Sequence, residues 1–194
     1  MKNRPLILAS SSIYRQDLLK RLRVPFTVAS PNIDESPLSG ETPPETALRL
    51  AEQKARALLN RFPDALIIGS DQVCVLDERT IGKPGDYSTA VLQLTAASGK
   101  TLKFHTALCL LDSKSGQARC KVVTNEVKFR SLTRQQIERY LMAEKPYDCA
   151  GSAKSEGLGI ALIEYIHGDD PNALVGLPLI ELTTMLITAG VAVI

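Results

Sequence analysis

The sequence predicts an α/β fold in which a mixed, twisted sheet is flanked by helices. Short apolar runs that are typical of strands alternate with segments whose apolar residues recur at helical spacing. Two of the strand-like runs are joined by a short polar turn, which predicts an antiparallel hairpin within the sheet. The 194 residues are 44% hydrophobic, which is enough to bury a substantial core. Together these observations indicate a mixed sheet rather than an all-helical or all-strand protein.

The N-terminal part is expected to fold as a strand, a serine-rich turn and a helix. The apolar run 6–9 predicts a buried strand, and the apolar residues from Tyr14 to Leu22 follow it at helical spacing. A second strand is expected at 26–29, before a loop over 31–44 that is rich in proline and acidic residues.

The next helix has a clear start. Thr42 can cap it, Pro43 suits the first helical position, and Glu45 completes a capping box. Its apolar face continues at helical spacing as far as Phe62, so we expect a helix that ends near this residue.

The remaining elements follow from the same signals. Two strand-like runs, 65–69 and 73–76, are interrupted by the polar residues Ser70, Asp71 and Gln72. After them the sequence predicts, in order, a helix over 86–98, hairpin strands over 102–111 and 121–129, a helix from Thr133 to Ala143, a strand over 157–166 and a last helix from Pro178 to Gly190.

The composition excludes several classes of protein. The 23 basic and 21 acidic side chains give a formal charge of +2, which argues against a general nucleic-acid or membrane-surface binder. No apolar run is long enough for a membrane span or a signal peptide, so we expect a cytoplasmic protein. The four cysteines form no C-x-x-C pair and there are two histidines, so we expect reduced thiols and no zinc site.

The turn after the first strand suits a phosphate group. Ser10, Ser12 and Arg15 lie where a strand leads into a helix, and a helix N-terminus offers unpaired N–H groups and a positive dipole end. Arginine adds a forked, permanently charged donor. The alternative is a serine that caps the helix beside an arginine in solvent. The glycines of a Walker A motif are missing.

Asp71 is the acid most indicative of function. It lies between the apolar segments ALIIG and VCVL, where a carboxylate is costly unless it binds a metal, accepts hydrogen bonds or acts as a base. Glu35, Lys54 and Lys83 are ambiguous from local pattern alone. They suit a loop acid, a solvated helix lysine and a turn lysine as well as a ligand site.

Two later segments add candidate ligands. The glycine-rich loop 151–159 carries Lys154 and Glu156, and its glycines allow close approach of the backbone to a ligand. The acidic segment 168–172 contains Asp169 and suits either a cation site or a helix cap.

Taken together, these side chains predict a site for an anionic ligand. Positive charge comes from Arg15, Lys54, Lys83 and Lys154, while Glu35, Asp71 and Asp169 are candidate metal ligands or bases. Carboxylates combined with phosphate favour Mg²⁺ or Mn²⁺ as the cofactor.

The sequence resembles the Maf family of nucleotide pyrophosphatases. The resemblance covers nearly the whole chain, in order, through LILASSSIYR, AEQKA, IIGSDQVCV, GKP, AGSAKSEGLG and GDDPNALVGLPL. It implies one Maf-like domain over 1–194, with two lobes around a central cleft, and a possible homodimer. It also implies hydrolysis of a nucleoside triphosphate between its α- and β-phosphates, which releases a nucleoside monophosphate and pyrophosphate.

The resemblance also implies roles for individual residues. Asp71 matches the family's general base. The positions that match the family's phosphate-binding residues are Ser10, Ser12, Arg15, Lys54, Lys83 and Lys154, and its acidic position falls on Glu35.

Three positions resemble the branch of the family that acts on 7-methyl-GTP. They are Tyr14, Gln72 and Glu156, where the pyrimidine-hydrolysing branch has arginine, threonine and glutamine. An aromatic face attracts a cationic 7-methylguanine ring, and a carboxylate can accept hydrogen bonds from guanine N–H groups. Tyr14 also has the spacing of an ordinary core aromatic. The alternatives are a pyrophosphatase for another modified or pyrimidine nucleotide and a non-catalytic nucleotide sensor that acts in division control.

Overall fold

The structure is a computed structural model that describes residues 4–194. It confirms the predicted α/β class, because five α-helices flank a mixed seven-stranded sheet with the order β2-β1-β3-β5-β6-β7, and β4 pairs with β3 beside this path. Within the described range no helix is long and apolar enough to cross a membrane.

The strands are β1 Leu6–Ala9, β2 Thr27–Ala29, β3 Leu66–Leu76, β4 Arg79–Ile81, β5 Thr101–Asp112, β6 Ala118–Phe129 and β7 Ile163–His167. The helices are α1 Ile13–Lys20, α2 Pro43–Arg56, α3 Tyr87–Ala97, α4 Arg134–Glu144 and α5 Leu179–Thr188, with short 3₁₀ segments η1 Ala150–Ser152, η2 Leu158–Leu162 and η3 Pro171–Val175.

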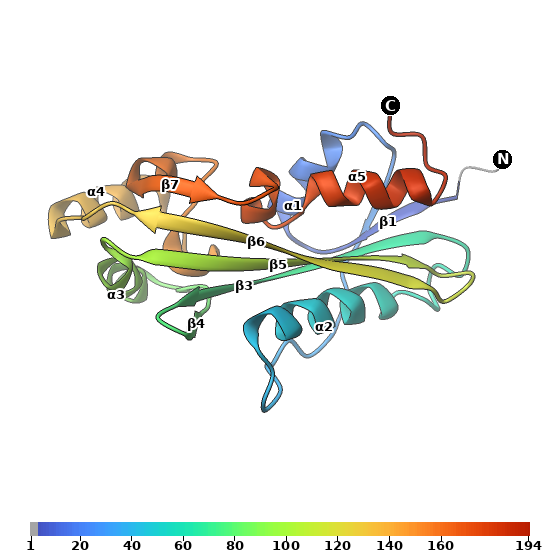
Figure 1. Cartoon of the computed structure of the whole chain (residues 1–194), viewed down its shortest axis with the longest axis horizontal. Coiled ribbons are helices and arrows are strands. Elements are labelled where there is room, and N and C mark those ends of the chain that lie inside the picture. The colour runs from blue at the N-terminus through green and yellow to red at the C-terminus, as the bar shows by residue number, and fades with distance from the viewer. Residues whose placement is uncertain (1–3) are drawn as a thin grey trace.

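Three apolar clusters hold the helices on the sheet. Near β1, α2 covers one face, and α1 and α5 cover the other (Figure 1). A third cluster lies at the opposite end, where α3, α4 and η2 pack against β5, β6 and β7. The long strands β3, β5 and β6 run through both ends. The molecule therefore has two packed parts that share one sheet.

The pairing along one edge of β3 is interrupted. β1 runs parallel to β3 and its last paired residue, Ala9, lies opposite Gly69. β4 runs antiparallel and begins its pairing with Ile81 opposite Cys74. Residues 70–73 therefore pair with β5 alone. This leaves an open edge in the middle of a buried strand.

The structure corrects the prediction that polar residues interrupt this strand. β3 is continuous from Leu66 to Leu76, because Ser70, Asp71 and Gln72 all pair with β5 and their side chains find polar partners.

Two predicted boundaries are also wrong. The strand expected over 157–166 begins only at Ile163, because Gly157 and Gly159 lie in close contact with other parts of the chain and lead into η2. The helix expected to reach Phe62 ends at Arg56, and a series of turns follows it. The hairpin, the capping boxes at Thr42 and Thr133 and the last helix are confirmed.

A row of polar side chains crosses the sheet between the apolar clusters. We call Ser70, Gln72, Thr106 and Asn125 the polar strip. Each member donates a hydrogen bond to a backbone carbonyl in the segment 170–176, which contains η3. These bonds attach the segment directly to β3, β5 and β6. They satisfy buried donors that would otherwise be costly in a sheet interior.

The contact between α2 and β3 is so close that Gly69 has no room for a side chain. A Cβ at this position would lie 2.0 Å from the Ala51 carbonyl oxygen and 3.0 Å from the Ala55 nitrogen. Gly69→Ala is therefore expected to lower the free energy of unfolding by about 3 kcal/mol, near the upper end for an overpacked core. Urea denaturation of both proteins measures this difference.

Gly82→Ala is the matched control, because a Cβ there would meet nothing within 4 Å. It is expected to leave stability within about 1 kcal/mol of the original protein. A Gly69→Ala variant as stable as the Gly82→Ala variant would contradict the close packing of α2 on β3.

Candidate active site

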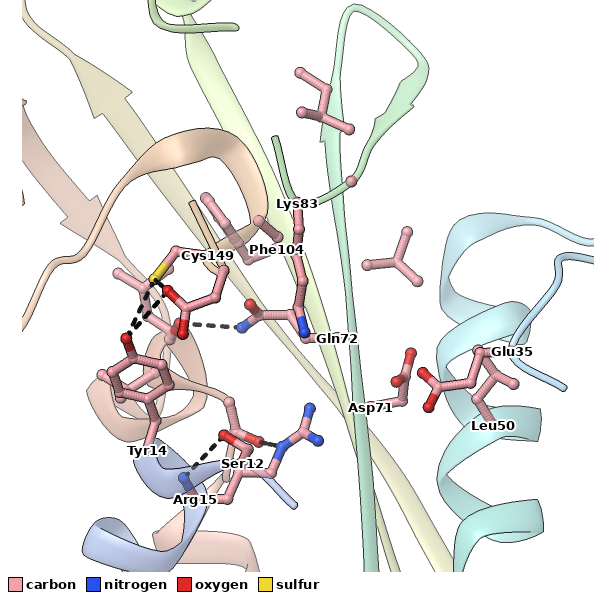
Figure 2. A pocket seen from close by; sticks show the side chains of 18 of the residues that line it. Ser12, Tyr14, Arg15, Glu35, Leu50, Asp71, Gln72, Lys83, Phe104 and Cys149 are labelled. Atoms are coloured by element: carbon pink, nitrogen blue, oxygen red, sulfur yellow. Dashed lines mark hydrogen bonds between the residues drawn. The ribbon is translucent and has the colours of Figure 1, made fainter. Parts of the chain in front are cut away.

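A cleft opens at the interrupted edge of β3. Its volume of about 760 Å³ falls in the range of small-molecule sites, roughly 300–1,000 Å³. Its walls come from the turn after β1, the loop before α2, the turn after β4, and the segments around η1 and η3. Figure 2 shows side chains that point into it from several of these elements. Segments that are far apart in the sequence therefore meet at one place.

Lys54 of α2 lies between two carboxylates in this cleft. Its Nζ donates to Glu35 Oε2 at 2.8 Å and to Asp71 Oδ1 at 2.7 Å. Lys54 is only 5% exposed, and it needs these partners because an unpaired buried charge is costly. The two carboxylates face each other in Figure 2. The structure thus brings together three residues that the sequence indicated separately.

Arg49, one turn earlier on α2, holds the loop that carries Glu35. Its guanidinium donates to both carboxylate oxygens of Glu41 and to the Ser36 carbonyl. The hydrogen bond from Arg49 lowers the pKa of Glu41 to about 2, so this carboxylate is ionised near neutral pH. Arg49 therefore connects α2 to the Glu41 side chain and to the backbone at Ser36, and these bonds hold the loop that leads into α2.

The serine-rich turn after β1 forms the facing wall. Ser12 caps α1 by accepting a hydrogen bond from the Arg15 N–H at 3.4 Å, and Ser10 Oγ accepts one from the Ser12 N–H at 3.1 Å. Arg15 Nε donates to the Gly176 carbonyl at 2.8 Å. The end of the guanidinium then points toward Asp71 in Figure 2. Burial lowers the pKa of Arg15, and the nearby carboxylates oppose this effect.

Lys83 enters the cleft from the turn after β4. Figure 2 shows its side chain reaching down beside Gln72 and toward Asp71. With Arg15 and Lys54, it gives the cleft three cationic side chains, two of which lie near the Asp71 carboxylate. This part of the cleft is suited to a polyanion.

Another part of the cleft is aromatic and acidic. Tyr14 Oη donates to Asp148 Oδ1 at 3.3 Å and accepts a weak hydrogen bond from Cys149 Sγ at 3.9 Å. Burial is the main cause that raises the pKa of Tyr14, so its hydroxyl stays protonated and can donate. Glu156 and Phe104 also line the cleft. The phenol is thus fixed in place by its polar end.

Gln72 lines the cleft, but its amide group is engaged within the protein. Its Nε2 donates to Thr106 Oγ1 at 2.9 Å and to the carbonyls of Ala173 and Leu174 at 3.0 Å each. The side chain therefore holds η3 against the sheet. The side-chain oxygen Oε1 and the backbone of Gln72 are the groups left to contact a ligand.

The structure does not bring Lys154 to the cationic part of the cleft. Lys154 is not a lining residue, and its Nζ bonds Glu144 at 3.0 Å. The same ammonium lies 5.8 Å from the centre of the Tyr14 ring. Lys154 therefore lies beside the aromatic part of the cleft.

Asp169 is exposed and does not line the cleft with Glu35 and Asp71. Its neighbour Asp170 is buried and accepts hydrogen bonds from the backbone N–H groups of Asn172 and Ile180. The acidic segment therefore caps helices through Asp170. Among residues 4–194, no group of three or more His, Cys, Asp or Glu side chains is arranged to hold a metal ion.

Sequence reasoning missed several residues of the cleft. Asp148 and Cys149 lie in an irregular segment whose only signal was its position just before the glycine-rich loop. Phe104 belongs to a strand whose alternation predicts a core residue. Glu41, which lines the cleft, and its partner Arg49 carried no signal, because their pairing across a loop is visible only in three dimensions.

Comparison with known proteins agrees with this geometry. The family model described as "Maf-like protein" matches residues 5–189. A 7-methyl-GTP pyrophosphatase of Methylobacillus flagellatus is 58% identical over 190 residues, which cover 98% of this chain and 99% of the relative. Proteins of the same name from Paraburkholderia xenovorans and Cupriavidus metallidurans are 60% and 56% identical, over 97% and 95% of this chain and 94% and 93% of theirs. Since both the family model and these relatives span nearly its full length, the chain belongs to the Maf family.

Proposed function

We propose that this chain hydrolyses 7-methyl-GTP to 7-methyl-GMP and pyrophosphate. The observation that carries the proposal is the division of one cleft into a cationic part around Asp71 and an aromatic, acidic part around Tyr14. A triphosphate is anionic and a 7-methylguanine ring is cationic, so the two parts suit the two ends of one molecule. The names of the relatives support the same substrate.

In the proposed reaction, a water oxygen attacks the α-phosphorus. The bond from that phosphorus to the oxygen that bridges the α- and β-phosphates breaks, and pyrophosphate leaves. Asp71 takes the proton from the attacking water. Its Oδ1 bonds Lys54, which holds the carboxylate in a fixed orientation. Asp71 is almost fully buried, so the water would react in a site that is largely shielded from solvent.

The cationic side chains have a separate role in the proposal. Negative charge grows on the phosphate oxygens in the transition state, and fixed cations stabilise it without reorganising. Arg15 is fixed by its bond to the Gly176 carbonyl and Lys54 by its two carboxylates. Lys83 also lines the cleft. Ser10 and Ser12 are placed to add hydroxyl donors to the same phosphates.

The acid pair also fits a divalent cation. Glu35 and Asp71 present hard carboxylate oxygens to the same part of the cleft, and Mg²⁺ is usually held by one or two carboxylates together with substrate phosphates. These two residues would hold Mg²⁺ or Mn²⁺, which when bound supplies further neutralisation of the phosphate charge. Glu35 is the more exposed of the two side chains, so it can change partners more easily.

The aromatic part would select the base. The Tyr14 ring offers a face for stacking, and its hydroxyl is anchored by Asp148. Glu156 lines the same cleft and supplies a carboxylate for the N–H groups of guanine.

The proposal includes a cytoplasmic location and a homodimer, as the sequence and the family resemblance lead us to expect.

A screen of methylated and unmethylated nucleoside triphosphates, with release of pyrophosphate as the readout and Mg²⁺ or Mn²⁺ present, tests the proposed substrate. We expect the highest kcat/KM for 7-methyl-GTP. Equal or faster hydrolysis of UTP or dTTP would point to another nucleotide, and binding without any pyrophosphate release would indicate a sensor.

Asp71→Asn is expected to lower kcat about 100-fold or more, the usual contribution of a general base. The amide keeps the size of the side chain but cannot accept the proton, so the Kd for 7-methyl-GTP should change much less than kcat. Steady-state kinetics and equilibrium binding measure the two effects separately. Asp77→Asn is the control, because Asp77 lies outside the cleft and pairs with Lys100. Unchanged turnover in Asp71→Asn would remove Asp71 from the role of base.

Tyr14→Ala is expected to weaken binding of 7-methyl-GTP by about 1–3 kcal/mol, the range for stacking of a base on an aromatic side chain. Glu156→Gln should reduce the preference for 7-methyl-GTP over GTP, because it removes the charge that favours a cationic base. Titration calorimetry with both nucleotides measures these changes.

Tyr165→Ala and Glu164→Gln on β7 are the matched controls, since neither residue lines the cleft. If the two cleft variants keep the original preference among 7-methyl-GTP, GTP and UTP, the assignment of Tyr14 and Glu156 to the base is wrong.

A further inference from the structure

Glu144, the last residue of α4, holds the glycine-rich loop although it lies outside the cleft. Its carboxylate accepts a hydrogen bond from the Leu158 N–H at 2.8 Å and pairs with Lys154 Nζ at 3.0 Å. Its side chain is only 16% exposed. Both bonds lower the pKa of Glu144, which keeps the carboxylate ionised. One acid thus binds the loop at two points, on either side of Glu156.

The loop is wrapped closely around this carboxylate. A Cβ on Gly157 would lie 2.8 Å from Glu144 Oε1, and a Cβ on Gly159 would lie 2.4 Å from the Lys154 carbonyl oxygen. The Lys154 N–H also donates to the buried Tyr140 hydroxyl at 3.0 Å. Gly157 therefore serves contact with α4 and Gly159 serves contact within the loop, and the two contacts set the position of Glu156.

The same carboxylate also affects the surroundings of Tyr14. Glu144 holds Lys154, and the Lys154 ammonium lies 5.8 Å from the centre of the Tyr14 ring. Attraction between a cation and an aromatic face favours this placement. Two residues proposed to select the base, Tyr14 and Glu156, are therefore connected through one acid that itself does not line the cleft.

We propose that Glu144 is a positioning residue for base selection, which acts by fixing Glu156 and by pairing with Lys154, so that the ammonium beside the Tyr14 ring is neutralised and does not repel a cationic base. The inference rests on the proposed function, because the selectivity it explains is that for 7-methyl-GTP over GTP. It also assigns Lys154 to the base-selecting part of the cleft instead of the phosphates.

Glu144→Ala is expected to lower the ratio of kcat/KM for 7-methyl-GTP to that for GTP by about 10- to 100-fold, as misplacement of a binding group does. The loss should arise mainly in KM, because Asp71 and its partners are untouched. Glu144→Gln, which can still accept from the Leu158 N–H, should give a smaller loss and guards against a misfolded alanine variant. Glu138→Ala on the same helix is the control, since Glu138 pairs with Arg134 at the surface. It should leave the ratio unchanged.

Hydrogen exchange of the backbone amides of 154–159, which needs no substrate, is the second readout. Faster exchange in Glu144→Ala but not in Glu138→Ala is expected. Unchanged exchange, or faster exchange with an unchanged selectivity ratio, overturns the inference. If the unmodified protein itself shows no preference for 7-methyl-GTP, the proposed function fails. The exchange result then still decides whether Glu144 holds the loop.

A different observation concerns two cysteines on neighbouring strands. Cys109 of β5 lies directly opposite Cys120 of β6. The Asp112 N–H donates to the Gln117 carbonyl at 2.9 Å, which marks 112 and 117 as a hydrogen-bonded pair. Such pairs alternate along an antiparallel ladder, so the cysteines form a non-hydrogen-bonded pair, for which the Cα atoms are about 4.5 Å apart. This separation lies within the range that a disulfide spans, about 4.4–6.8 Å.

The two thiols differ in their environment. Both are free, and both belong to the apolar cluster under α2, but Cys109 is fully buried while Cys120 is partly exposed. Hydrogen bonding to the Cys109 thiol lowers the pKa of Cys120, although burial opposes this effect. The pKa of Cys109 is raised by the same hydrogen bond and by burial. The accessible sulfur is therefore also the one that ionises more readily.

The register and exposure of the pair assign a modification site: we infer that Cys109 and Cys120 form a disulfide when the protein meets a peroxide. The Cys120 thiolate attacks one peroxide oxygen, the O–O bond breaks, and the other oxygen leaves as hydroxide. The Cys109 sulfur then attacks the sulfenic acid, the S–O bond breaks, and the leaving oxygen takes up the Cys109 proton and becomes water. Both sulfurs are oxidised and the peroxide is reduced to water.

Treatment with hydrogen peroxide, followed by peptide mapping and thermal unfolding, tests this site. We expect a 109–120 link and a higher Tm, because the bond restricts the unfolded chain. Dithiothreitol should reverse both, and Cys120→Ser should abolish both. Oxidation of Cys149 without any 109–120 link would overturn the inference, as would a Tm increase that persists in Cys120→Ser.

Discussion

The interrupted pairing along β3 is the constraint on which the rest of the cleft depends. β1 stops at Ala9 and β4 starts at Ile81, so the middle of β3 has a strand on only one side. The carboxyl end of β1 and the turn after β4 both open toward this gap, and they bring Arg15 and Lys83 to it. Filling the gap with another strand would preserve the sheet but remove the cleft. The interrupted pairing in the middle of the sheet therefore creates the space in which the charged side chains of the site meet.

The charges around Asp71 are better explained by a ligand than by stability. Burying an ammonium and a carboxylate together costs desolvation energy that their attraction roughly offsets, so such a group adds little to the free energy of folding. Lys54 nevertheless lies almost fully buried between Asp71 and Glu35, and Arg15 points at the same place. A set of fixed charges of this kind binds polyanions well, because it is already oriented before the ligand arrives.

Local signals in the sequence were sufficient for most helices and strands but not for most partners of the site. Capping residues and periodicity placed α2, α4 and the β5–β6 hairpin, because these signals act within a few residues. They could not show that Lys54 is buried, since its partners come from the loop before α2 and from β3. The surroundings of Lys154 could not be predicted for a similar reason. Its charge suggested phosphate, whereas Glu144 draws it to the opposite part of the cleft. The polar residues of β3 suggested a break in the strand, because the segment that satisfies them lies about a hundred residues later.

The Gly176 carbonyl has a consequence for how the protein is made. It accepts from both Arg15 and Ser70, which precede it by 161 and 106 residues. Gly176 adopts φ 109°, a conformation that suits glycine, so this acceptor is set by a residue close to the C-terminus. A ribosome synthesises the chain from the N-terminus, and the serine-rich turn therefore emerges long before the carbonyl that orients its arginine. The arginine of the polyanion site therefore lacks the acceptor that orients it until residue 176 has been synthesised.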